Sequence, residues 1–472
     1  MKERLEVPAL GARLRDWLFE KGVEFPCGGL AGCGACRIRV LRGEVPITAE
    51  MRGSLSEVEL AEGWRLACQA EAASPLLVEI EQWSAAPVLS DHSKVAYESR
   101  HGFGAAIDLG TTTVVVQVVD LESGEIAAVE TAWNAQARYG ADIMSRLDCA
   151  RREPGLLTEV IRRQLESMLS RARAGRELRE ILLVGNTAMH HLCGGLDVAP
   201  LCAAPFRSPH LNSYEFKLDG APALFLGSIG GFAGSDLLAG LIACDLPNAT
   251  WPQALLDLGT NGEIAFGCRD GIEVASTAAG PAFEAGRITQ GMRAAAGAID
   301  QVRAVNGRMR CRVIGGGTPR GVCGSGLVDA VAAALELGWI APSGRMLRPT
   351  RLTEGVSLLQ RDIRELQLAK AAVASGFRLL SQGQPAQAVY LSGAFGNYIR
   401  ASSAVRIGLL PGGGGPISPA GNTALRGARK LLLNPSQRRS IFECLRREIR
   451  HVELAALPEF HDAFVDEMEF PD

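Results

Sequence analysis

The chain of 472 residues is 47% hydrophobic and 21% charged, and its formal net charge at pH 7 is −3. A chain of this size and composition can bury more than one hydrophobic core and suits roughly three domains. The nearly balanced charge provides no basic field for nucleic acid or a membrane surface. No apolar run approaches the ~20 residues of a membrane helix, and the N-terminus has no apolar stretch of secretory length. We therefore expect a cytoplasmic protein.

Four of the twelve cysteines are spaced as ligands of an iron–sulfur cluster. Cys27, Cys33 and Cys36 lie in the segment CGGLAGCGAC, and Cys68 follows well downstream. This is the layout of plant-type ferredoxins, with the first gap one residue longer. Zinc is the alternative, but zinc sites usually contain two short Cys-x-x-Cys pairs and this chain has one. The spacing therefore predicts that these four cysteines hold one [2Fe-2S] cluster.

Residues 1–83 fit a small α+β domain of the β-grasp type. Apolar side chains at helical spacing between positions 10 and 18 share one face, and apolar and arginine side chains alternate over 37–40 as in a half-buried strand. The segment resembles the [2Fe-2S] domain of adrenodoxin-like ferredoxins. Such domains open with a β-hairpin, and here we expect the first strand to be absent or shortened. Residues 84–103 lose apolar periodicity and carry Ser, Pro and charge, which predicts a short linker.

A repeated pattern follows the linker. The segments AAIDLGTTTVVV, residues 105–116, and ALLDLGTNGEIAFG, residues 254–267, each end an apolar run in Asp-Leu-Gly-Thr before a second β-rich run. Each predicts a hairpin whose tight turn presents N–H groups and hydroxyls to an anion, beside an Asp suited to magnesium. One copy alone would be read as an ordinary turn. The pair resembles the phosphate motifs of the actin, sugar kinase and Hsp70 ATPase superfamily, in which two related lobes clamp ATP and Mg²⁺.

Further glycine-rich segments continue this pattern along the chain. GNTAMHHL follows a buried strand, and we expect its His190 and His191 to pack at a helix start rather than to act as bases. Residues 230–244 read as a loop entering a helix that joins the lobes, and 280–297 as a clamp loop. Residues 321–338 form a glycine loop feeding a helix, where a ribose or phosphate fits the helix N-terminus. Residues 388–399 resemble the adenosine motif, and 421–433 the second interlobe helix.

The order of these motifs, ending in the tail VELAALPEFHDAFVDEMEFP, resembles one family, the reductive activators of corrinoid proteins. The expected fold class is α/β, a two-lobed actin-like ATPase with duplicated RNase H-like lobes, preceded by the α+β ferredoxin. The expected domains are a ferredoxin (1–83), a linker (84–103) and an ATPase (104–472). Within the ATPase the first lobe spans about 104–250, the second about 251–420, and a C-terminal segment 421–472. Longer family members carry an extra domain before the ATPase, which 84–103 cannot hold.

The resemblance implies an ATP-hydrolysing activator that passes an electron from its cluster to an inactive Co(II) corrinoid protein and regenerates Co(I) for methyl transfer. An upstream donor such as a reductase or ferredoxin would supply the electron. A homodimer is left open, and neither nucleic acid nor a membrane is an expected partner. Two alternatives stay open: a small-molecule kinase of the sugar or acetate kinase superfamily, and a ferredoxin electron carrier whose ATPase half only senses nucleotide.

By resemblance, Asp108 and Asp257 face Mg²⁺ and the attacking water, and Glu263 is a third candidate for the catalytic base. The other residues expected around ATP belong to the glycine-rich segments. They are Gly110, Thr111, Thr112 and Thr113; Gly259, Thr260, Asn261 and Gly262; Gly280, Gly324, Ser325 and Gly326; and Gly393, Gly396 and Asn397.

Overall fold

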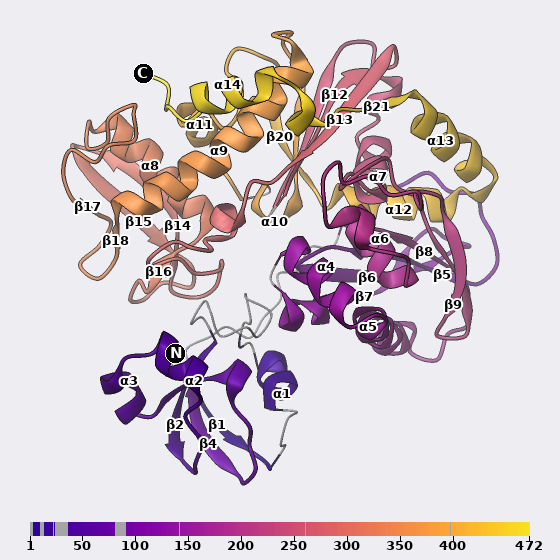
Figure 1. Ribbon diagram of the computed structural model, residues 1–472. Coiled ribbons are helices and arrows are strands. Elements are labelled where there is room, and N and C mark those ends of the chain that lie inside the picture. Colours follow the sequence, from indigo (N-terminus) through magenta and orange to yellow (C-terminus); the bar gives the residue numbers. More distant parts are fainter. Residues whose placement is uncertain are drawn as a thin grey trace.

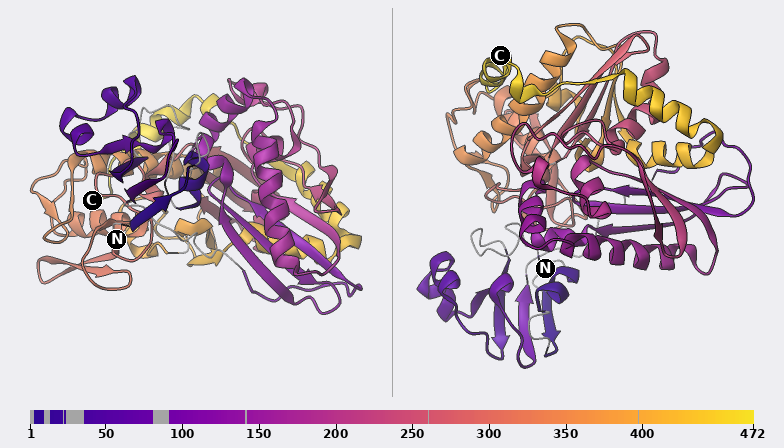
Figure 2. Two further views of the ribbon diagram at one scale, coloured as in Figure 1. Left: turned by 90° about the horizontal axis from the view of Figure 1, so that it is seen from below. Right: turned by 45° about the vertical axis from the view of Figure 1, so that its right-hand side comes forward.

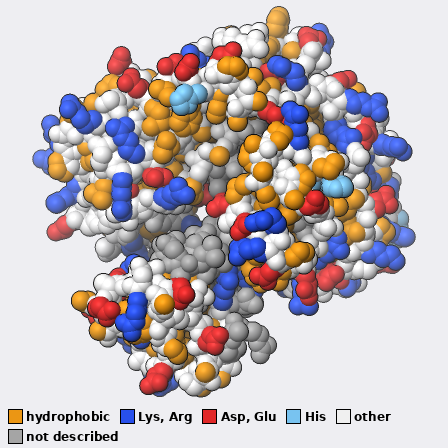
Figure 3. All heavy atoms as spheres, viewed as in Figure 1, with side chains coloured by type: hydrophobic (Ala, Val, Ile, Leu, Met, Phe, Trp, Pro, Cys, Tyr) orange, Lys and Arg blue, Asp and Glu red, His pale blue; other side chains and the backbone are white. Residues whose placement is uncertain are grey.

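The computed structural model describes residues 3–9, 14–21, 23, 36–80, 91–140, 142–259, 261–396 and 398–472. These residues form a small N-terminal unit and a larger unit with two lobes (Figure 1). Basic and acidic side chains are interspersed over the face of the large unit in Figure 3, in keeping with the balanced composition. Within the described part of the chain, no helix combines the length and apolar character needed to cross a bilayer.

The N-terminal unit is a four-stranded sheet in the order β1–β4–β2–β3. Its strands are β1 (Glu3–Val7), β2 (Arg37–Arg42), β3 (Trp64–Leu66) and β4 (Leu76–Ile80). Its helices are α1 (Leu14–Glu20), α2 (Ala49–Ser54), α3 (Glu57–Ala61) and the short η1 (Ala67–Gln69). Leu14, Leu18 and Ile38 are fully buried in its core, as the helical and alternating patterns predicted.

The edge of this sheet differs from a domain that opens with a hairpin. Strand β1 pairs antiparallel with β4, from Glu3 opposite Ile80 to Val7 opposite Leu76. Among the described residues, the opening of the domain is therefore shortened to a single strand, which occupies the sheet edge itself.

The first lobe is a six-stranded sheet in the order β7–β6–β5–β8–β10–β9. Its strands are β5 (Phe103–Leu109), β6 (Thr113–Asp120), β7 (Ile126–Trp133), β8 (Leu178–Val184), β9 (Tyr214–Leu218) and β10 (Ala221–Phe225). Strands β5, β6 and β7 form an antiparallel meander, and β8 lies parallel to β5. One face is covered by α4 (Ile143–Arg152), α5 (Leu156–Arg173) and α6 (Thr187–Gly194). Strand β6 is buried over Thr113–Val119, Gln117 included, because helices cover both faces of the sheet.

The second lobe repeats this arrangement in the order β20–β19–β11–β12–β13–β21. Its strands are β11 (Gln253–Leu258), β12 (Gly262–Cys268), β13 (Gly271–Thr277), β19 (Val389–Ser392), β20 (Ile417–Gly421) and β21 (Ile449–His451). Strands β11, β12 and β13 form the meander, and β19 lies parallel to β11. The duplication predicted from the two Asp-Leu-Gly-Thr segments is therefore present. The C-terminal β21 completes the edge beside β13.

Helices α7 (Ser235–Ala243) and α12 (Thr423–Leu433) lie between the two large sheets (Figures 1 and 2). They share one hydrophobic core with Ala106 and Val115 of the first sheet and with Leu255 and Ala265 of the second. The prediction of two interlobe helices is borne out at both positions.

The rest of the second lobe lies on the far face of its sheet. Its helices are η5 (Pro281–Glu284), α8 (Gly324–Glu336), α9 (Gln360–Ser381), α10 (Gly393–Gly396) and α11 (Ala401–Arg406). Its small sheets are β14 (Ala298–Val305), β15 (Arg308–Val313) and β16 (Gly321–Val322), and β17 (Thr350–Arg351) with β18 (Ser357–Leu358). The chain ends with α13 (Pro435–Glu448), η6 (Leu454–Ala456) and α14 (Glu459–Asp466), the last packed on α9.

Candidate active site

The two repeated segments form equivalent hairpins at the facing edges of the lobes. In the first, the Gly110 amide donates to the Thr113 carbonyl oxygen at 3.1 Å, and a Cβ on Gly110 would lie 2.7 Å from that oxygen. In the second, the Gly259 amide donates to the Asn261 carbonyl oxygen at 3.0 Å, which closes a turn one residue tighter. Thr260 lies outside the described residues. Both predicted hairpins are therefore present, and each turn begins two residues after one of the predicted aspartates.

Asp108 and Asp257 occupy matching places at the ends of β5 and β11. Asn422 Nδ2 donates to Asp108 Oδ2 at 2.7 Å, and Ser392 Oγ donates to Asp257 Oδ2 at 3.2 Å. Burial raises the pKa of Asp108 to about 7, and the nearby charge of Asp257 adds to the shift. Burial likewise raises the pKa of Asp257 to about 6. The fold thus brings the two predicted carboxyls together in a site that disfavours their ionised forms.

Asp236 is a further carboxyl of this cluster that the sequence reasoning missed. It lies in the first turn of α7, where its Oδ1 accepts from the Leu237 amide at 2.8 Å. Burial raises its pKa, and the charges of Asp257 and Asp108 raise it further. It is the one charged residue in the apolar segment GGFAGSDLLAGLIAC, and that isolation was a signal available in the sequence.

Glu263 joins the same cluster from β12, directly across the ladder from Asp257. Burial raises its pKa well above the ordinary value, with the charges of Asp236 and Asp257 adding to the shift. Across the described residues, no three His, Cys, Asp or Glu side chains are arranged to hold a metal by themselves. The hard oxygen donors nevertheless fit Mg²⁺, which usually keeps several waters and binds through one or two carboxylates plus phosphate oxygens.

The first hairpin is held from behind by polar side chains. Asn186 Nδ2 donates to Thr111 Oγ1 at 2.8 Å, and Asn134 Nδ2 donates to the Gly110 carbonyl oxygen at 2.9 Å. The fully buried Arg146 donates from Nη1 to the Thr111 carbonyl oxygen at 2.6 Å. Burial lowers the pKa of Arg146 to about 10, so it stays a cation near neutral pH. Neither Arg146 nor Asn134 was among the predicted site residues.

One contact reaches across the cleft at this point. Thr112 Oγ1 donates to Glu284 Oε1 of η5 in the second lobe at 3.3 Å. Thr113, the last residue of the first turn, is buried at the start of β6. The hydroxyls of Thr111 and Thr112 are thus hydrogen-bonded to protein groups in this structure, and Thr113 is buried.

Three further predicted glycines, at positions 280, 393 and 396, lie in different surroundings. Gly393 has φ +82°, and a Cβ there would lie 2.5 Å from Asp257 Oδ1, so the expected adenosine segment touches the carboxyl cluster. Gly280 also has a positive φ, of +74°, but faces open space. A Cβ on Gly396 would lie 3.2 Å from the Leu391 carbonyl carbon. Asn397 lies outside the described residues.

The glycines at the start of α8 are accounted for by packing. A Cβ on Gly324 would lie 1.7 Å from the Phe283 carbonyl oxygen. A Cβ on Gly326 would lie 2.1 Å from the Ile299 carbonyl oxygen. Ser325 Oγ donates to the Asp300 carbonyl oxygen at 3.1 Å. Contact of these three residues with ribose or phosphate remains a prediction. His190 and His191 are fully buried in α6, which confirms the packing role expected for them.

The predicted cluster ligands lie only partly within the described residues. Cys36 is buried at the start of β2, and Cys68 is half-buried in η1. The Ala67 amide donates to the Cys36 carbonyl oxygen at 2.8 Å, so the backbones that carry these two cysteines adjoin. Cys27 and Cys33 lie outside the described residues. The pair in view fits a site that draws ligands from two segments of the chain.

Comparison with known proteins decides the family. Residues 252–472 match the C-terminal, ASKHA domain of RACo, residues 103–249 the RACo middle region, and residues 2–73 a 2Fe-2S iron-sulfur cluster binding domain. The corrinoid activation enzyme RamQ of Eubacterium limosum is 33% identical over 421 residues, which cover 78% of this chain and 70% of that protein. The chain belongs to the corrinoid activator family.

A second relative and a solved structure add to the comparison. The [Co(II) methylated amine-specific corrinoid protein] reductase of Methanosarcina barkeri is 27% identical over 424 residues, covering 78% of this chain and 77% of that protein. The solved structure of a reductive activator for corrinoid, iron-sulfur protein has the same fold, with a TM-score of 0.68, 24% identity and coverage of 99% and 96%. The predicted fold class is confirmed, and the protein joins an iron–sulfur domain to a nucleotide-binding ASKHA domain.

Proposed function

We propose that this protein is an ATP-dependent reductive activator, which passes an electron from its cluster to a Co(II) corrinoid protein and restores Co(I) for methyl transfer. The observation that carries the proposal is the fusion, in one chain, of the iron–sulfur domain with two lobes whose duplicated hairpins enclose a buried carboxyl cluster. The names of two relatives, an activation enzyme and a Co(II) corrinoid protein reductase, point to the same activity.

The fusion makes physical sense for an uphill electron transfer. A [2Fe-2S] centre of the plant type supplies one electron near about −400 mV. For a one-electron couple, each further ~59 mV uphill costs a factor of ten in the equilibrium. A nucleotide-driven rearrangement of the lobes can offset this cost. It does so only if the rearranged protein binds the Co(I)-like state of the corrinoid protein more tightly than the Co(II) state.

We assign the roles in the cleft as follows. Asp108 and Asp257 would hold Mg²⁺, which would neutralise the phosphate charge, and the turns at 110–113 and 259–262 would hold the phosphates of ATP. Asp236 and Glu263, which belong to the same buried cluster, are the candidates for orienting the attacking water. Gly393 lets the adenosine segment approach Asp257.

The remaining assignments are also proposals. Cys27, Cys33, Cys36 and Cys68 are the ligands of a single [2Fe-2S] cluster. An upstream reductase or ferredoxin reduces it, and the protein works in the cytoplasm, with a homodimer left open. We retain the division into a ferredoxin (1–83), a linker (84–103) and an ATPase (104–472).

The test is anaerobic reduction of a Co(II) corrinoid protein, followed by the Co(I) absorbance band. We expect Co(I) only when reductant, cluster-loaded protein and hydrolysable Mg–ATP are all present, and faster ATP hydrolysis once the corrinoid protein is added. A non-hydrolysable nucleotide is the control. Catalytic Co(I) formation without nucleotide would favour the electron-carrier alternative, and phosphorylation of a small acceptor would favour the kinase.

A further inference from the structure

The start of helix α12 contacts one predicted magnesium carboxyl directly and is linked to the other through Ser392. Its N-cap Asn422 donates to Asp108, and its first residue Thr423 places Oγ1 2.7 Å from Ser392 Oγ, the hydroxyl that donates to Asp257. The Asn422 side chain is itself fixed, because its Oδ1 accepts from the Leu425 amide at 2.8 Å. A displacement of Asp108 therefore acts directly on the start of this helix, and a displacement of Asp257 acts on it through Ser392.

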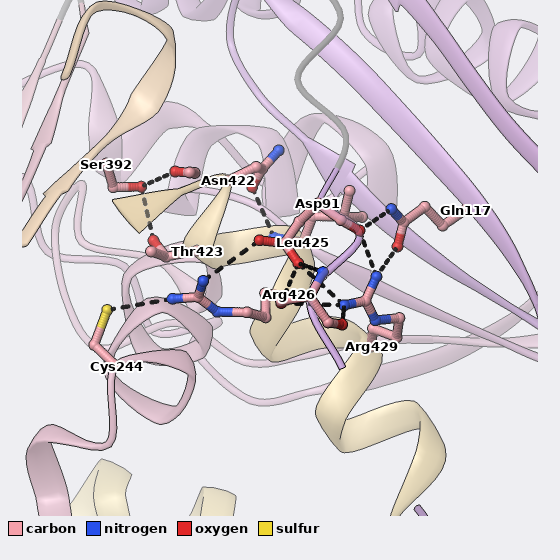
Figure 4. Close-up of polar contacts among 11 residues, drawn as sticks. Asp91, Gln117, Cys244, Ser392, Asn422, Thr423, Leu425, Arg426 and Arg429 are labelled. Atoms are coloured by element: carbon pink, nitrogen blue, oxygen red, sulfur yellow. Dashed lines mark hydrogen bonds and ion pairs between the residues drawn. The ribbon is translucent and has the colours of Figure 1, made fainter. Parts of the chain in front are cut away.

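The next turns of α12 hold the segment that leads from the ferredoxin (Figure 4). Arg429, which is 1% exposed, donates from Nη2 to Asp91 Oδ1 at 3.0 Å and from Nη1 to the Asp91 carbonyl oxygen at 2.5 Å. Arg426 adds a contact from Nη1 to Asp91 Oδ2 at 3.4 Å. Gln117 Nε2 of β6 donates to the same Asp91 carbonyl oxygen at 2.7 Å. Asp91 is therefore clamped by charge and by hydrogen bonds in a buried position.

Residues 91–100, here called the strap, then follow α12 to its C-terminal end. Asn434 Nδ2 donates to the Ala96 carbonyl oxygen at 2.7 Å, and the Glu98 amide donates to the Leu433 carbonyl oxygen at 3.0 Å. Arg100 Nη2 donates to the Leu432 carbonyl oxygen at 2.7 Å. Half of the predicted linker, residues 91–100 of 84–103, thus lies along one helix of the ATPase.

We propose that α12 transmits the nucleotide state of the ATPase to the ferredoxin. In this proposal the Asp91–Arg429 pair fixes the position of the strap, and so of the chain that leads to the ferredoxin. The inference rests on the proposed function and extends it to the question of how the halves communicate. Ile80 ends the last ferredoxin strand, and the chain from there to Asp91 can span at most about 40 Å. Where Asp91 is held therefore limits where the ferredoxin can present its electron.

The clamp suits this role because it is buried and specific. Separating a buried ion pair leaves an uncompensated charge in the protein, which costs free energy. Detachment of the strap from Arg429 is therefore unfavourable. The helix is also packed tightly against α7, since a Cβ placed on Gly427 would lie 1.9 Å from the Ala239 carbonyl oxygen. A rigid element that contacts both sites is the physical link such coupling requires.

The first measurement is hydrogen exchange of the full-length, cluster-loaded protein in its nucleotide-free, Mg–ADP and Mg–ATP states. We expect the amides of the strap to change protection with nucleotide, and the change to be lost in Asp91→Asn. Lys94→Ala, which alters an exposed side chain of the strap, is the matched control and should behave as wild type.

The second measurement compares the same variants in Co(I) formation. Asp91→Asn should keep the basal ATPase rate and the reduction of its cluster by dithionite, yet lose about tenfold or more of ATP-dependent Co(I) formation. Strap protection that ignores nucleotide in wild type, or full Co(I) formation by Asp91→Asn, overturns the inference while the proposed function stands. Failure of wild type to form Co(I) overturns the proposed function, and hydrogen exchange still tests the link without a corrinoid protein.

Discussion

The carboxyl cluster sets the chemistry of the cleft at the scale of single residues. Asp108 and Asp257 have pKa values raised by burial to about 7 and about 6, so their surroundings favour partial protonation near neutral pH. A bound Mg²⁺ reverses this preference, because the cation stabilises the ionised carboxylates. If these carboxyls hold Mg²⁺ as proposed, binding of Mg–ATP is linked to proton release.

The first prediction is a pH dependence of Mg–ATP binding. Affinity should rise from about pH 6 to about pH 8 with proton release, and Asp108→Asn should flatten the rise near pH 7. Calorimetry in buffers of different ionisation enthalpy measures both quantities. Binding of equal strength at all these pH values, without proton release, would exclude ionisation of the cluster as a step in binding.

Stability of the nucleotide-free protein should move in the opposite sense. The folded-state pKa of each aspartate lies above its ordinary 3.8, so the stabilising contribution is complete below about pH 4 and is lost as pH rises through about 6–7. The melting temperature should therefore fall between about pH 4 and about pH 7, and saturating Mg–ATP should remove the fall. A melting temperature that rises through pH 6–7 without nucleotide would contradict the raised pKa values.

The second prediction separates binding from hydrolysis. Asp257→Ala and Asp236→Asn should each lower the ATPase rate by about tenfold or more, and by a larger factor than they weaken ATP binding, because both groups act more strongly on the transition state than on the bound nucleotide. Single-turnover hydrolysis and equilibrium binding measure the two effects. Asp270→Asn, at an exposed turn of the same lobe, is the matched control. An unchanged ATPase rate in Asp257→Ala would remove its assignment.

At the scale of elements, the crossing of α7 and α12 depends on small residues. A Cβ on Gly427 would lie 1.9 Å from the Ala239 carbonyl oxygen, and one on Gly240 would lie 2.8 Å from Leu255 Cδ2. The two helices fill the space between both sheets, so neither can move away without disturbing a lobe. The glycines therefore fix how closely the lobes approach.

The third prediction tests this crossing. Gly427→Ala should destabilise the protein by about 1–3 kcal/mol, although an alanine ordinarily favours a helix by about 1 kcal/mol over glycine. Gly355→Ala, where a Cβ meets open space, should stay within about 0.5 kcal/mol of wild type in the same urea titration. A Gly427→Ala variant as stable as wild type would show that the helices tolerate a wider separation.

The elements show what the sequence could predict and what it could not. The two hairpins and both interlobe helices were predictable, because their signals are local runs of apolar and glycine residues. The ion pair between Asp91 and Arg429 was not predictable, since these residues lie 338 positions apart in the sequence. An arginine on a helix is also ordinarily interpreted as a solvated side chain. The sequence also cannot tell whether a loop glycine allows a ligand or another backbone segment to come close. At Gly324 it is the backbone of Phe283 that lies close.

At the scale of the whole molecule, the ferredoxin also touches the first lobe beside the cleft. The Arg15 guanidinium of α1 lies 5.0 Å from the centre of the Tyr139 ring, in η2 (Ala135–Tyr139). The residue that caps η2 is Asn134, whose side chain also donates to Gly110 of the first turn. The ferredoxin is thus placed both by its docking contact and by the strap, and both lead back to the nucleotide hairpins.

The last prediction asks whether one chain must contain both working halves. Cys36→Ser should lose the cluster and keep ATP hydrolysis, whereas Asp257→Asn should keep the cluster and lose hydrolysis. Neither variant alone should form Co(I), and an equimolar mixture should also fail, because the tether holds each ferredoxin at high effective concentration beside its own ATPase. The readout is the Co(I) band under reductant and Mg–ATP, with wild type mixed with an equal amount of either variant as the control. Activity restored in the mixture would mean that a ferredoxin serves the ATPase of another chain, as in a homodimer that exchanges domains, and coupling through the chain's own strap would then not be required.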